Sequence, residues 1–380
     1  MPKIIFLADL VWDGQVARGG HAMVVLQWLH GLKRLGHDVL LLNYVGAQQL
    51  RQRSATLSAF TALIAEWWHP AHTCLIHEDN SLFGLSISAA QEFARDAAAV
   101  IQFGIPGRRQ PPALVEKVRP RILLEQDPAY THLWATGYDP AEIFGEQDFY
   151  FTVGGNVGSP RCSLPTLGLQ WKPIWNPVMT SWWSGKTLVR DRFTTIADWY
   201  SQGYLEFDGK VLGPKSVEFR KFINLPQLVG EHLEIALAIS SDDPDSADLR
   251  KHGWHLESPD VVRTPELYRD YVTGSVGEFS CTKGGYAGTN CGWFSDRSAC
   301  YLAAGRPVVL QDTGFADLLP TGKGLFSVRT AEEAAEAIRA IRKDYRQHSA
   351  AARAIALEHF DSDKILTHVV TAAGIPVPKT

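Results

Sequence analysis

The first 45 residues hold the pattern that most constrains the fold of this chain. An apolar run at 3–8 leads into the loop DGQVARGGH, and apolar residues at helical spacing follow in 22–37. A second apolar run, DVLLLNYV, comes directly after them. A strand, a glycine-containing loop, a helix and a second strand at this spacing predict a βαβ unit, which builds a parallel sheet through a right-handed crossover.

The alternation continues along the chain and then starts again. Apolar runs that end in polar or glycine residues recur at 73–77, 98–104 and 121–127, with helical patterns between them. A second series of the same kind begins at 193–198. Alternating strands and helices predict an α/β fold, and a series that restarts predicts two Rossmann-like domains.

The segment 149–185 separates the two series. It is rich in Gly, Pro and Trp, and its apolar residues follow no sustained period. Such a composition is typical of an interdomain segment. A chain of 380 residues also exceeds what a single hydrophobic core usually serves. We therefore place the domains at residues 1–185 and 186–380.

Composition argues against several classes of protein. The formal net charge is -4 and no long basic run occurs, which argues against a nucleic-acid partner. The five cysteines never form a CxxC pair, so the sequence indicates neither a disulfide framework nor a zinc ribbon. No stretch approaches the roughly 20 apolar residues that a transmembrane helix needs. We expect a cytoplasmic protein without a transmembrane segment.

The segment 291–315, CGWFSDRSACYLAAGRPVVLQDTGF, combines a polar cluster with a helix and a strand. The cluster Ser295-Asp296-Arg297-Ser298 precedes an apolar helical pattern that ends at Gly305, and a small strand pattern follows. The N-terminus of a helix offers unbonded N–H groups and a partial positive charge, which suit a phosphate. Arg297 would add a bidentate contact. The alternative is that Ser295 or Asp296 only caps the helix.

This segment and the end of the chain resemble the donor-binding half of GT-B glycosyltransferases of the family 1 and family 4 type. The residues that carry the resemblance are SDRSACYLAAGRPVVLQDTGF, AEEAAEAIRAI and HSAAARAIALEHF. GGHAMVVLQWLHGLKRLGHDV resembles the start of the same family. The resemblance implies two Rossmann-like domains that face a cleft. The N-terminal domain would lie on the acceptor side, and the C-terminal domain, with closing C-terminal helices, would hold a nucleoside diphosphate sugar.

The sequence departs from the family at two positions. Many retaining members carry two glutamates before the G-x-P segment, and those places hold Gly292 and Cys300 here. The glutamate that the family would use to hold the ribose is therefore absent. Asp296 would take its place, and the alternative is that the nucleotide is held in another way. The departure keeps two alternatives open beside a hexosyltransferase-like enzyme: a sugar-nucleotide epimerase of the same fold, and a non-catalytic nucleotide-sugar-binding protein. A dehydrogenase is disfavoured because no G-x-G-x-x-G follows the first strand.

Further donor-binding candidates follow from the places that the resemblance gives them. Lys215 is expected against the diphosphate and Lys283 near the base or ribose, although a solvated helix face is the commoner position for such lysines. Asp312 and Thr313, directly after a strand, are expected to face the hydroxyls of the donor sugar, with an Asx turn as the alternative.

The first domain offers two candidates for acid–base chemistry. The loop Gly19-Gly20-His21 opens the first helix beyond the end of a strand, where open α/β sheets bind ligands. We assign the two glycines to donor binding and His21 to catalysis as a base or a donor, with capping as the alternative. Asp127, at the end of the apolar run 121–127, would take the proton of the acceptor hydroxyl, with turn capping as its alternative.

The sequence predicts no metal site and no cofactor beyond the nucleotide-sugar itself. The segment HPAHTCLIHED gathers His69, His72, Cys74 and His77. The last two belong to a strand pattern, in which neighbouring side chains alternate between opposite faces, so the set is a poor zinc site. The expected function is a metal-independent transfer of a sugar from a nucleoside diphosphate sugar to an acceptor that the sequence does not identify.

Overall fold

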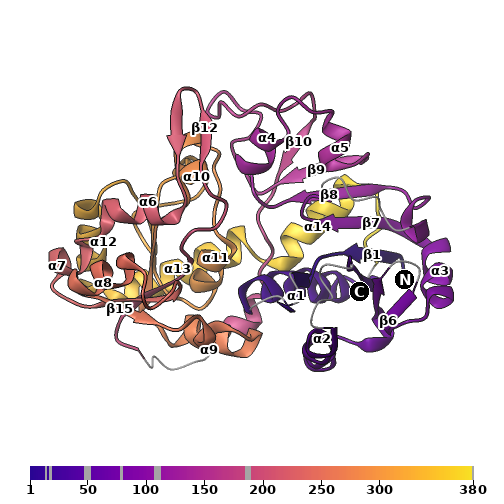
Figure 1. Ribbon diagram of the computed structural model, residues 1–380, viewed down its shortest axis with the longest axis horizontal. Helices are drawn as coiled ribbons and strands as arrows, with labels where there is room; N and C mark the ends of the chain where they lie inside the picture. The colour runs from indigo at the N-terminus through magenta and orange to yellow at the C-terminus, as the bar shows by residue number, and fades with distance from the viewer. Residues whose placement is uncertain are drawn as a thin grey trace.

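The computed structural model describes residues 1–12, 15–16, 19–46, 53–77, 80–106, 113–184 and 190–378. Two separate sheets form the frame of the molecule, and they occupy opposite halves of it (Figure 1). We refer to the half built on the first sheet as the N-terminal domain and to the other half as the C-terminal domain.

The first sheet has eight strands in the order β10-β9-β8-β7-β1-β4-β5-β6. All neighbouring strands run parallel except β5 and β6. The strands are β1 (Lys3–Leu7), β4 (Asp38–Tyr44), β5 (Thr73–His77), β6 (Asn80–Gly84), β7 (Ala97–Phe103), β8 (Arg121–Glu125), β9 (Phe149–Thr152) and β10 (Trp171–Pro173). Its helices are α1 (Gly19–Arg34), α2 (Arg53–Trp67), α3 (Ile87–Arg95), α4 (Tyr130–Trp134) and α5 (Pro140–Phe144).

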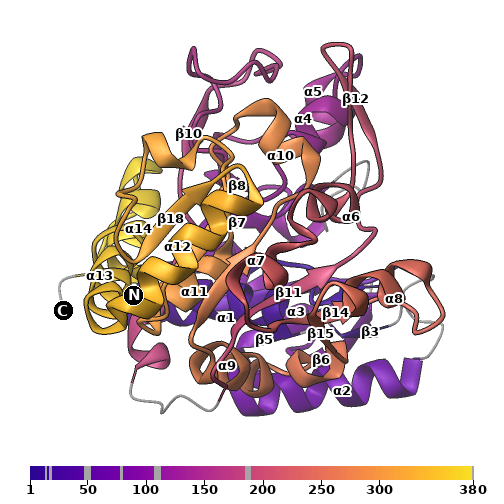
Figure 2. The same ribbon diagram turned by 90° about the vertical axis from the view of Figure 1, so that its left-hand side faces the viewer.

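The second sheet has six parallel strands in the order β15-β14-β11-β16-β17-β18. They are β11 (Phe193–Asp198), β14 (Leu233–Ala238), β15 (Trp254–Glu257), β16 (Gly277–Ser280), β17 (Val308–Gln311) and β18 (Leu325–Val328). Figure 2 faces this domain and shows α12 and α13 beside β18. The helices after β11 are α6 (Lys215–Phe219), α7 (Leu225–Val229), α8 (Pro244–Lys251), α9 (Pro265–Gly274), α10 (Gly284–Thr289), α11 (Asp296–Ala303), α12 (Ala331–Lys343), α13 (Tyr345–His359) and α14 (Ser362–Ala372).

Buried parallel strands consist of almost continuous apolar residues, because helices cover both faces of such a sheet. The inner strands β1, β4 and β7 follow this rule, whereas β11 and β16 of the second sheet include polar residues. Strands β5 and β11 begin and end where the sequence predicts. The prediction of an α/β fold with two Rossmann-like halves is confirmed. The prediction that 149–185 only connects the domains was wrong at its start, because β9 and β10 extend the first sheet.

The last helix, α14, lies in the N-terminal half of the molecule and packs on α1 (Figure 1). Leu366 and Val369 belong to the same buried cluster as Trp28. A Cβ on Gly31 of α1 would overlap the side chain of Leu366, so this close packing requires a glycine. The helix therefore adds to the core of the first domain, although it follows the whole of the second.

The chain crosses between the domains twice, and the two crossings lie side by side. The amide of Val178 donates to the carbonyl of Phe360 at 2.7 Å, and the amide of Ser362 donates to the carbonyl of Val178 at 3.0 Å. Val178 and Asp361 form an isolated parallel bridge. The outgoing and returning segments thus support each other at the junction.

One face of α1 forms much of the contact between the domains. Gln27, fully buried, accepts hydrogen bonds from the amide of Met179 at 3.1 Å and from the indole of Trp183 at 3.0 Å. Met23 belongs to the buried cluster of the C-terminal domain that contains Tyr268 of α9. This face of α1 brings the first helix against the second domain.

Candidate active site

The polar cluster Ser295 to Ser298 lies at the start of α11, as the sequence predicts. Ser295 occupies the N-cap position, but its side chain makes no capping hydrogen bond. Ser298 is fully buried, and its Oγ has no hydrogen-bond partner among the described residues. The alternative in which Ser295 only caps the helix through its hydroxyl is therefore not what the structure shows.

Arg297 points inward, beneath the first turn of α11. Its Nε lies 2.5 Å from Oε1 of Glu278, a fully buried carboxylate on β16. Its Nη1 donates to the carbonyl of Ile196 at 2.9 Å, and its Nη2 donates to Oγ of Ser280 at 2.8 Å. Burial alone would lower the pKa of Arg297, but the charge and hydrogen bond of Glu278 outweigh it and raise the pKa. Only the remaining Nη hydrogens are left for a ligand, so the expected bidentate phosphate contact is limited to them.

Lys215, the first residue of α6, also lies near the hydroxyl of Ser280 that Arg297 contacts. Its Nζ lies 3.5 Å from Oγ of Ser280, at the limit of a hydrogen bond. The residue is 8% exposed, and no carboxylate of the described residues lies within ion-pair distance of its Nζ. Burial, followed by the charge of Arg297, lowers the pKa of Lys215 to about 8. A buried ammonium that forms no direct ion pair with the described residues is well suited to bind an anion.

Lys283, the N-cap residue of α10, is the third cation of this region. Nζ of Lys283 lies 3.7 Å from Oδ1 of Asp127, which belongs to the N-terminal domain. The hydroxyl of Tyr286 donates to the same oxygen at 2.5 Å. The charge of Lys283 contributes to the lowered pKa of Lys215, so the two lysines belong to one positively charged region. The structure thus brings together two residues, Asp127 and Lys283, that the sequence predicts separately for opposite sides of a cleft.

A second carboxyl group, that of Glu125, holds the backbone of Asp127 through a hydrogen bond. Glu125, the last residue of β8, is fully buried, and its Oε1 accepts the amide of Asp127 at 2.5 Å. The hydroxyls of Thr131 and Thr152 donate to Glu125 at 2.8 Å and 2.7 Å. Burial raises the pKa of Glu125 to about 8, although these hydrogen bonds oppose the shift. Glu125 fixes the turn that presents Asp127 at the domain junction.

Gly19 and Gly20 lie in the first turn of α1 and pack against the C-terminal domain. The amide of Gly19 donates to the carbonyl of Arg263 at 2.9 Å. A Cβ on Gly19 would lie 2.5 Å from the carbonyl of Thr264, and one on Gly20 would lie 3.2 Å from the ring of Tyr268. Both glycines therefore serve close approach of the two domains. The N–H of Gly19 already has an acceptor and is not presented to a donor phosphate here, contrary to the expectation from the sequence.

His21 is exposed at the start of α1. Its Nε2 lies 2.9 Å from the carbonyl of Asp9, and its ring meets the ring of Phe103 edge-on. The charge of His21 acts on Asp296 of α11, and the largest influence on that carboxyl is burial, which raises the pKa of Asp296. His21 and Asp296 thus lie across the junction from each other, as the two-domain prediction requires.

Asp312 and Thr313 lie at the end of β17, but their side chains are bonded within the protein. Oδ1 of Asp312 accepts the amide of Gly314 at 3.0 Å, and its Oδ2 lies 2.8 Å from Arg329. The hydroxyl of Thr313 donates to the carbonyl of Trp293 at 2.5 Å. This is the Asx turn of the alternative interpretation, and the expectation that both side chains face a donor sugar is not met in this structure.

Three residues of the candidate site are absent from the sequence-based candidates. Ser280 is the hydroxyl that Lys215 and Arg297 share, and Tyr286 holds Asp127. Tyr268 is buried beside Gly20, and its hydroxyl has no partner among the described residues. The sequence carries a signal for Ser280 alone, as a polar residue at the end of the short strand GEFS.

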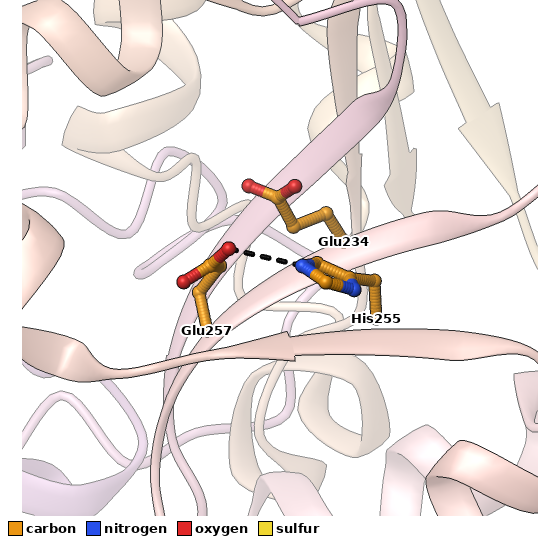
Figure 3. A group of neighbouring side chains, drawn as sticks. All are labelled: Glu234, His255 and Glu257. Atoms are coloured by element: carbon orange, nitrogen blue, oxygen red, sulfur yellow. Dashed lines mark hydrogen bonds and ion pairs between the residues drawn. The ribbon is translucent and has the colours of Figure 1, made fainter.

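One group of side chains elsewhere has the composition of a metal site (Figure 3). Glu234 of β14 and His255 and Glu257 of β15 offer ligand atoms that lie within 4.8 Å of one another. However, Glu234 lies 3.1 Å from Arg192 and 3.5 Å from Arg190, and Nε2 of His255 lies 2.9 Å from Glu257. Two guanidinium groups beside the buried carboxylate oppose a cation. Among the described residues, no group that includes the histidines of 69–77 meets the same distance criterion.

Comparisons with known proteins identify the fold. No family model and no curated protein matches the sequence. Solved structures do match: HepE of Anabaena in complex with UDP and glucose has a TM-score of 0.58 at 12% identity, over 98% of this chain and 100% of HepE. An α-glucosyltransferase in complex with UDP and DNA has a TM-score of 0.57 at 10% identity, over 98% and 99% of the two chains. AviGT4, a glycosyltransferase of avilamycin A biosynthesis, has a TM-score of 0.56 at 13% identity, over 98% and 97%.

These proteins are GT-B glycosyltransferases, and the match covers nearly the whole of each chain. The chain therefore has the GT-B fold, and the resemblance inferred from the sequence is confirmed at the level of the fold. Within the residues that the structure covers, no helix is both long enough and apolar enough to span a membrane.

Proposed function

We propose that this protein transfers a sugar, of the hexose type, from a nucleoside diphosphate sugar to an acceptor hydroxyl. The observation that carries the proposal is Lys215, a buried ammonium. Among the described residues its one hydrogen bond, at 3.5 Å, goes to a neutral hydroxyl that Arg297 shares. Charge buried without a partner is costly, so the site is built for an anion that arrives from outside. Structural neighbours solved with UDP or UDP-glucose support a nucleoside diphosphate as that anion.

The reaction requires charge stabilisation on one side and a proton acceptor on the other. The bond between the anomeric carbon and the diphosphate oxygen breaks, and its electron pair goes to that oxygen. Lys215, the remaining Nη hydrogens of Arg297 and the N–H groups at the start of α11 would meet the developing charge. The acceptor oxygen bonds to the anomeric carbon, and its proton would pass to Asp127. His21 would contact the donor from the N-terminal domain.

These cations supply the charge that a divalent ion supplies in other transferases, so we propose a transfer without a metal ion or cofactor. Asp296 would bind the ribose, and Lys283 would bind near it. A reaction in the cytoplasm agrees with the five free, buried cysteines. An acceptor of the nucleic-acid type is disfavoured by the net charge of -4, although one structural neighbour was solved with DNA.

Calorimetric titration with UDP and with uridine tests the anion site. Lys215→Met should weaken UDP binding by about 1.5–3 kcal/mol, the range for a hydrogen bond to a charged group, and should leave uridine binding unchanged. Lys215→Arg keeps the charge and is the matched control. Equal losses for UDP and uridine in Lys215→Met would contradict the assignment. Release of UDP from UDP-glucose distinguishes transfer or hydrolysis from non-catalytic binding, and analysis of the recovered sugar-nucleotide detects an epimerase.

A further inference from the structure

The ring of Tyr286 is packed between aromatic neighbours. The tyrosine is 2% exposed and lies on α10 of the C-terminal domain. Its ring stacks on Trp293, with centroids 4.3 Å apart and an interplanar angle of 14°. It also meets the ring of Tyr130 edge-on at 5.4 Å. A buried side chain with these two ring contacts has little freedom, so its hydroxyl is held near one position.

Asp127 comes to this hydroxyl from the other domain, and its backbone is equally fixed. Glu125 accepts its amide, and the amide and hydroxyl of Thr131 both donate to its carbonyl, at 3.1 Å and 3.0 Å. Its Oδ1 receives the hydroxyl of Tyr286 at 2.5 Å and lies 3.7 Å from Nζ of Lys283. Among the residues that the structure describes, no hydrogen bond reaches Oδ2.

The two carboxylate oxygens of Asp127 therefore have different surroundings. One is anchored by the C-terminal domain, and the other is left for a ligand on a side chain that is 36% exposed. A general base must lie within hydrogen-bond reach of the proton it abstracts, and a carboxylate that rotates freely meets this condition only part of the time. The anchor removes that freedom.

We propose that Tyr286 is a positioning residue: from the donor-binding domain it fixes the carboxylate of Asp127 so that Oδ2 faces the acceptor hydroxyl. The inference rests on the proposed function. It adds that the base is assembled from both domains, so that proton abstraction depends on the contact between α10 and the turn after β8. A ligand that separates the two domains would leave Asp127 without its anchor.

The variant Tyr286→Phe removes the hydroxyl and keeps the stacked ring. We expect UDP affinity within about twofold of the unmodified protein, because the phenol does not touch the anion site around Lys215. The turnover of the donor should fall about tenfold or more, since loss of geometry affects the chemical step. Turnover is measured with water as the acceptor of the sugar, as release of nucleoside diphosphate from UDP-glucose, UDP-galactose, UDP-N-acetylglucosamine and GDP-mannose.

Tyr130→Phe is the matched control, because Tyr130 lies in the same aromatic group. Within the described part of the chain, its hydroxyl accepts the amide of Gly285 at 3.4 Å and makes no other hydrogen bond. The double variant Asp127→Asn/Tyr286→Phe should be no slower than Asp127→Asn alone, because Tyr286 acts through Asp127. If the two substitutions lower turnover independently, so that their factors multiply in the double variant, then Tyr286 has a merely structural role. UDP affinity, measured on the same preparations, shows whether Tyr286→Phe is folded.

Each result counts for or against the inference. Equal turnover in Tyr286→Phe and Tyr130→Phe would overturn it while leaving UDP binding, and thus the anion site, intact. A protein that binds UDP yet releases nucleoside diphosphate from none of the four donors would have no base for Tyr286 to position, which also overturns it. A protein that binds no nucleoside diphosphate would instead refute the proposed function.

Discussion

Arg297 and Glu278 form an ion pair beneath the first turn of α11, with 2.5 Å between Nε and Oε1. The carboxylate is fully buried, and its Oε2 has no hydrogen-bond partner among the described residues. Glu278 therefore neutralises the charge of Arg297, and Lys215 is the cation whose charge is less compensated by a neighbouring carboxylate. This division of roles leads to different expectations for the two residues.

Removing the buried carboxylate should be costly. Glu278→Gln leaves Arg297 without its counter-charge, and breaking a buried pair in this way typically costs about 3–5 kcal/mol of unfolding free energy. Urea denaturation measures the loss. The control is Glu257→Gln, because that carboxylate is partly exposed and far smaller changes are expected there. A loss below about 1 kcal/mol for Glu278→Gln would mean that Arg297 finds another acceptor.

The affinity for UDP should depend on pH through Lys215. Burial holds the pKa of Lys215 at about 8, below the ordinary lysine value of about 10.4. The ammonium is therefore complete below neutral pH and is lost as the pH rises through 8. Affinity should fall above pH 8, by up to about tenfold for each pH unit. Lys215→Arg keeps its charge over this range and should show a flat profile. An equally steep fall in that variant would assign the dependence to another group.

Asp296→Ala distinguishes a ribose contact from a structural role. If Asp296 binds the ribose, UDP and uridine should lose affinity by similar factors, because both carry that sugar. Arg297→Ala should weaken UDP more than uridine, and it should also destabilise the fold through the unpaired Glu278. Calorimetry with both ligands and a thermal scan of both variants separate these effects. Unchanged binding of both ligands by Asp296→Ala would remove it from the site.

Gly19 has less room for a side chain than Gly20 has. A Cβ there would overlap backbone carbonyls of the opposite domain, whereas a Cβ on Gly20 would meet only the ring of Tyr268 at 3.2 Å. Gly19→Ala should therefore cost about 1–3 kcal/mol of unfolding free energy, the usual range for overpacking, and Gly20→Ala clearly less. Thermal and urea unfolding of the two variants test the order. The reverse order would contradict the packing of α1 against α9.

Binding of UDP should survive chelation. The anion site consists of side-chain cations and a helix N-terminus, so EDTA should change the affinity less than twofold, and added magnesium should not raise it. Calorimetry with and without EDTA is sufficient. A loss of affinity that magnesium or zinc restores would show that a metal ion takes part in binding.

The sequence predicts the order of the elements well, because buried parallel strands are continuous apolar runs that need no tertiary information. The short strands β9 and β10 were missed, since glycine and proline residues surround them and neither is long enough to show a period. The approach of Arg297 and Lys215 to one region could be predicted only from the resemblance to a family. The contact of Asp127 with Tyr286 could not, because no local pattern links residues so far apart in the chain.

The paired crossings at Val178 and Asp361 have a practical consequence. The described residues between these two neighbouring points form the C-terminal domain. The described segments before and after them build the N-terminal domain, in which both chain ends lie (Figure 1). The second domain is thus a contiguous insertion within the sequence of the first. Its ends meet in space, so one exchanged stretch of DNA could replace the entire C-terminal domain and leave the N-terminal domain, including α14, as it was.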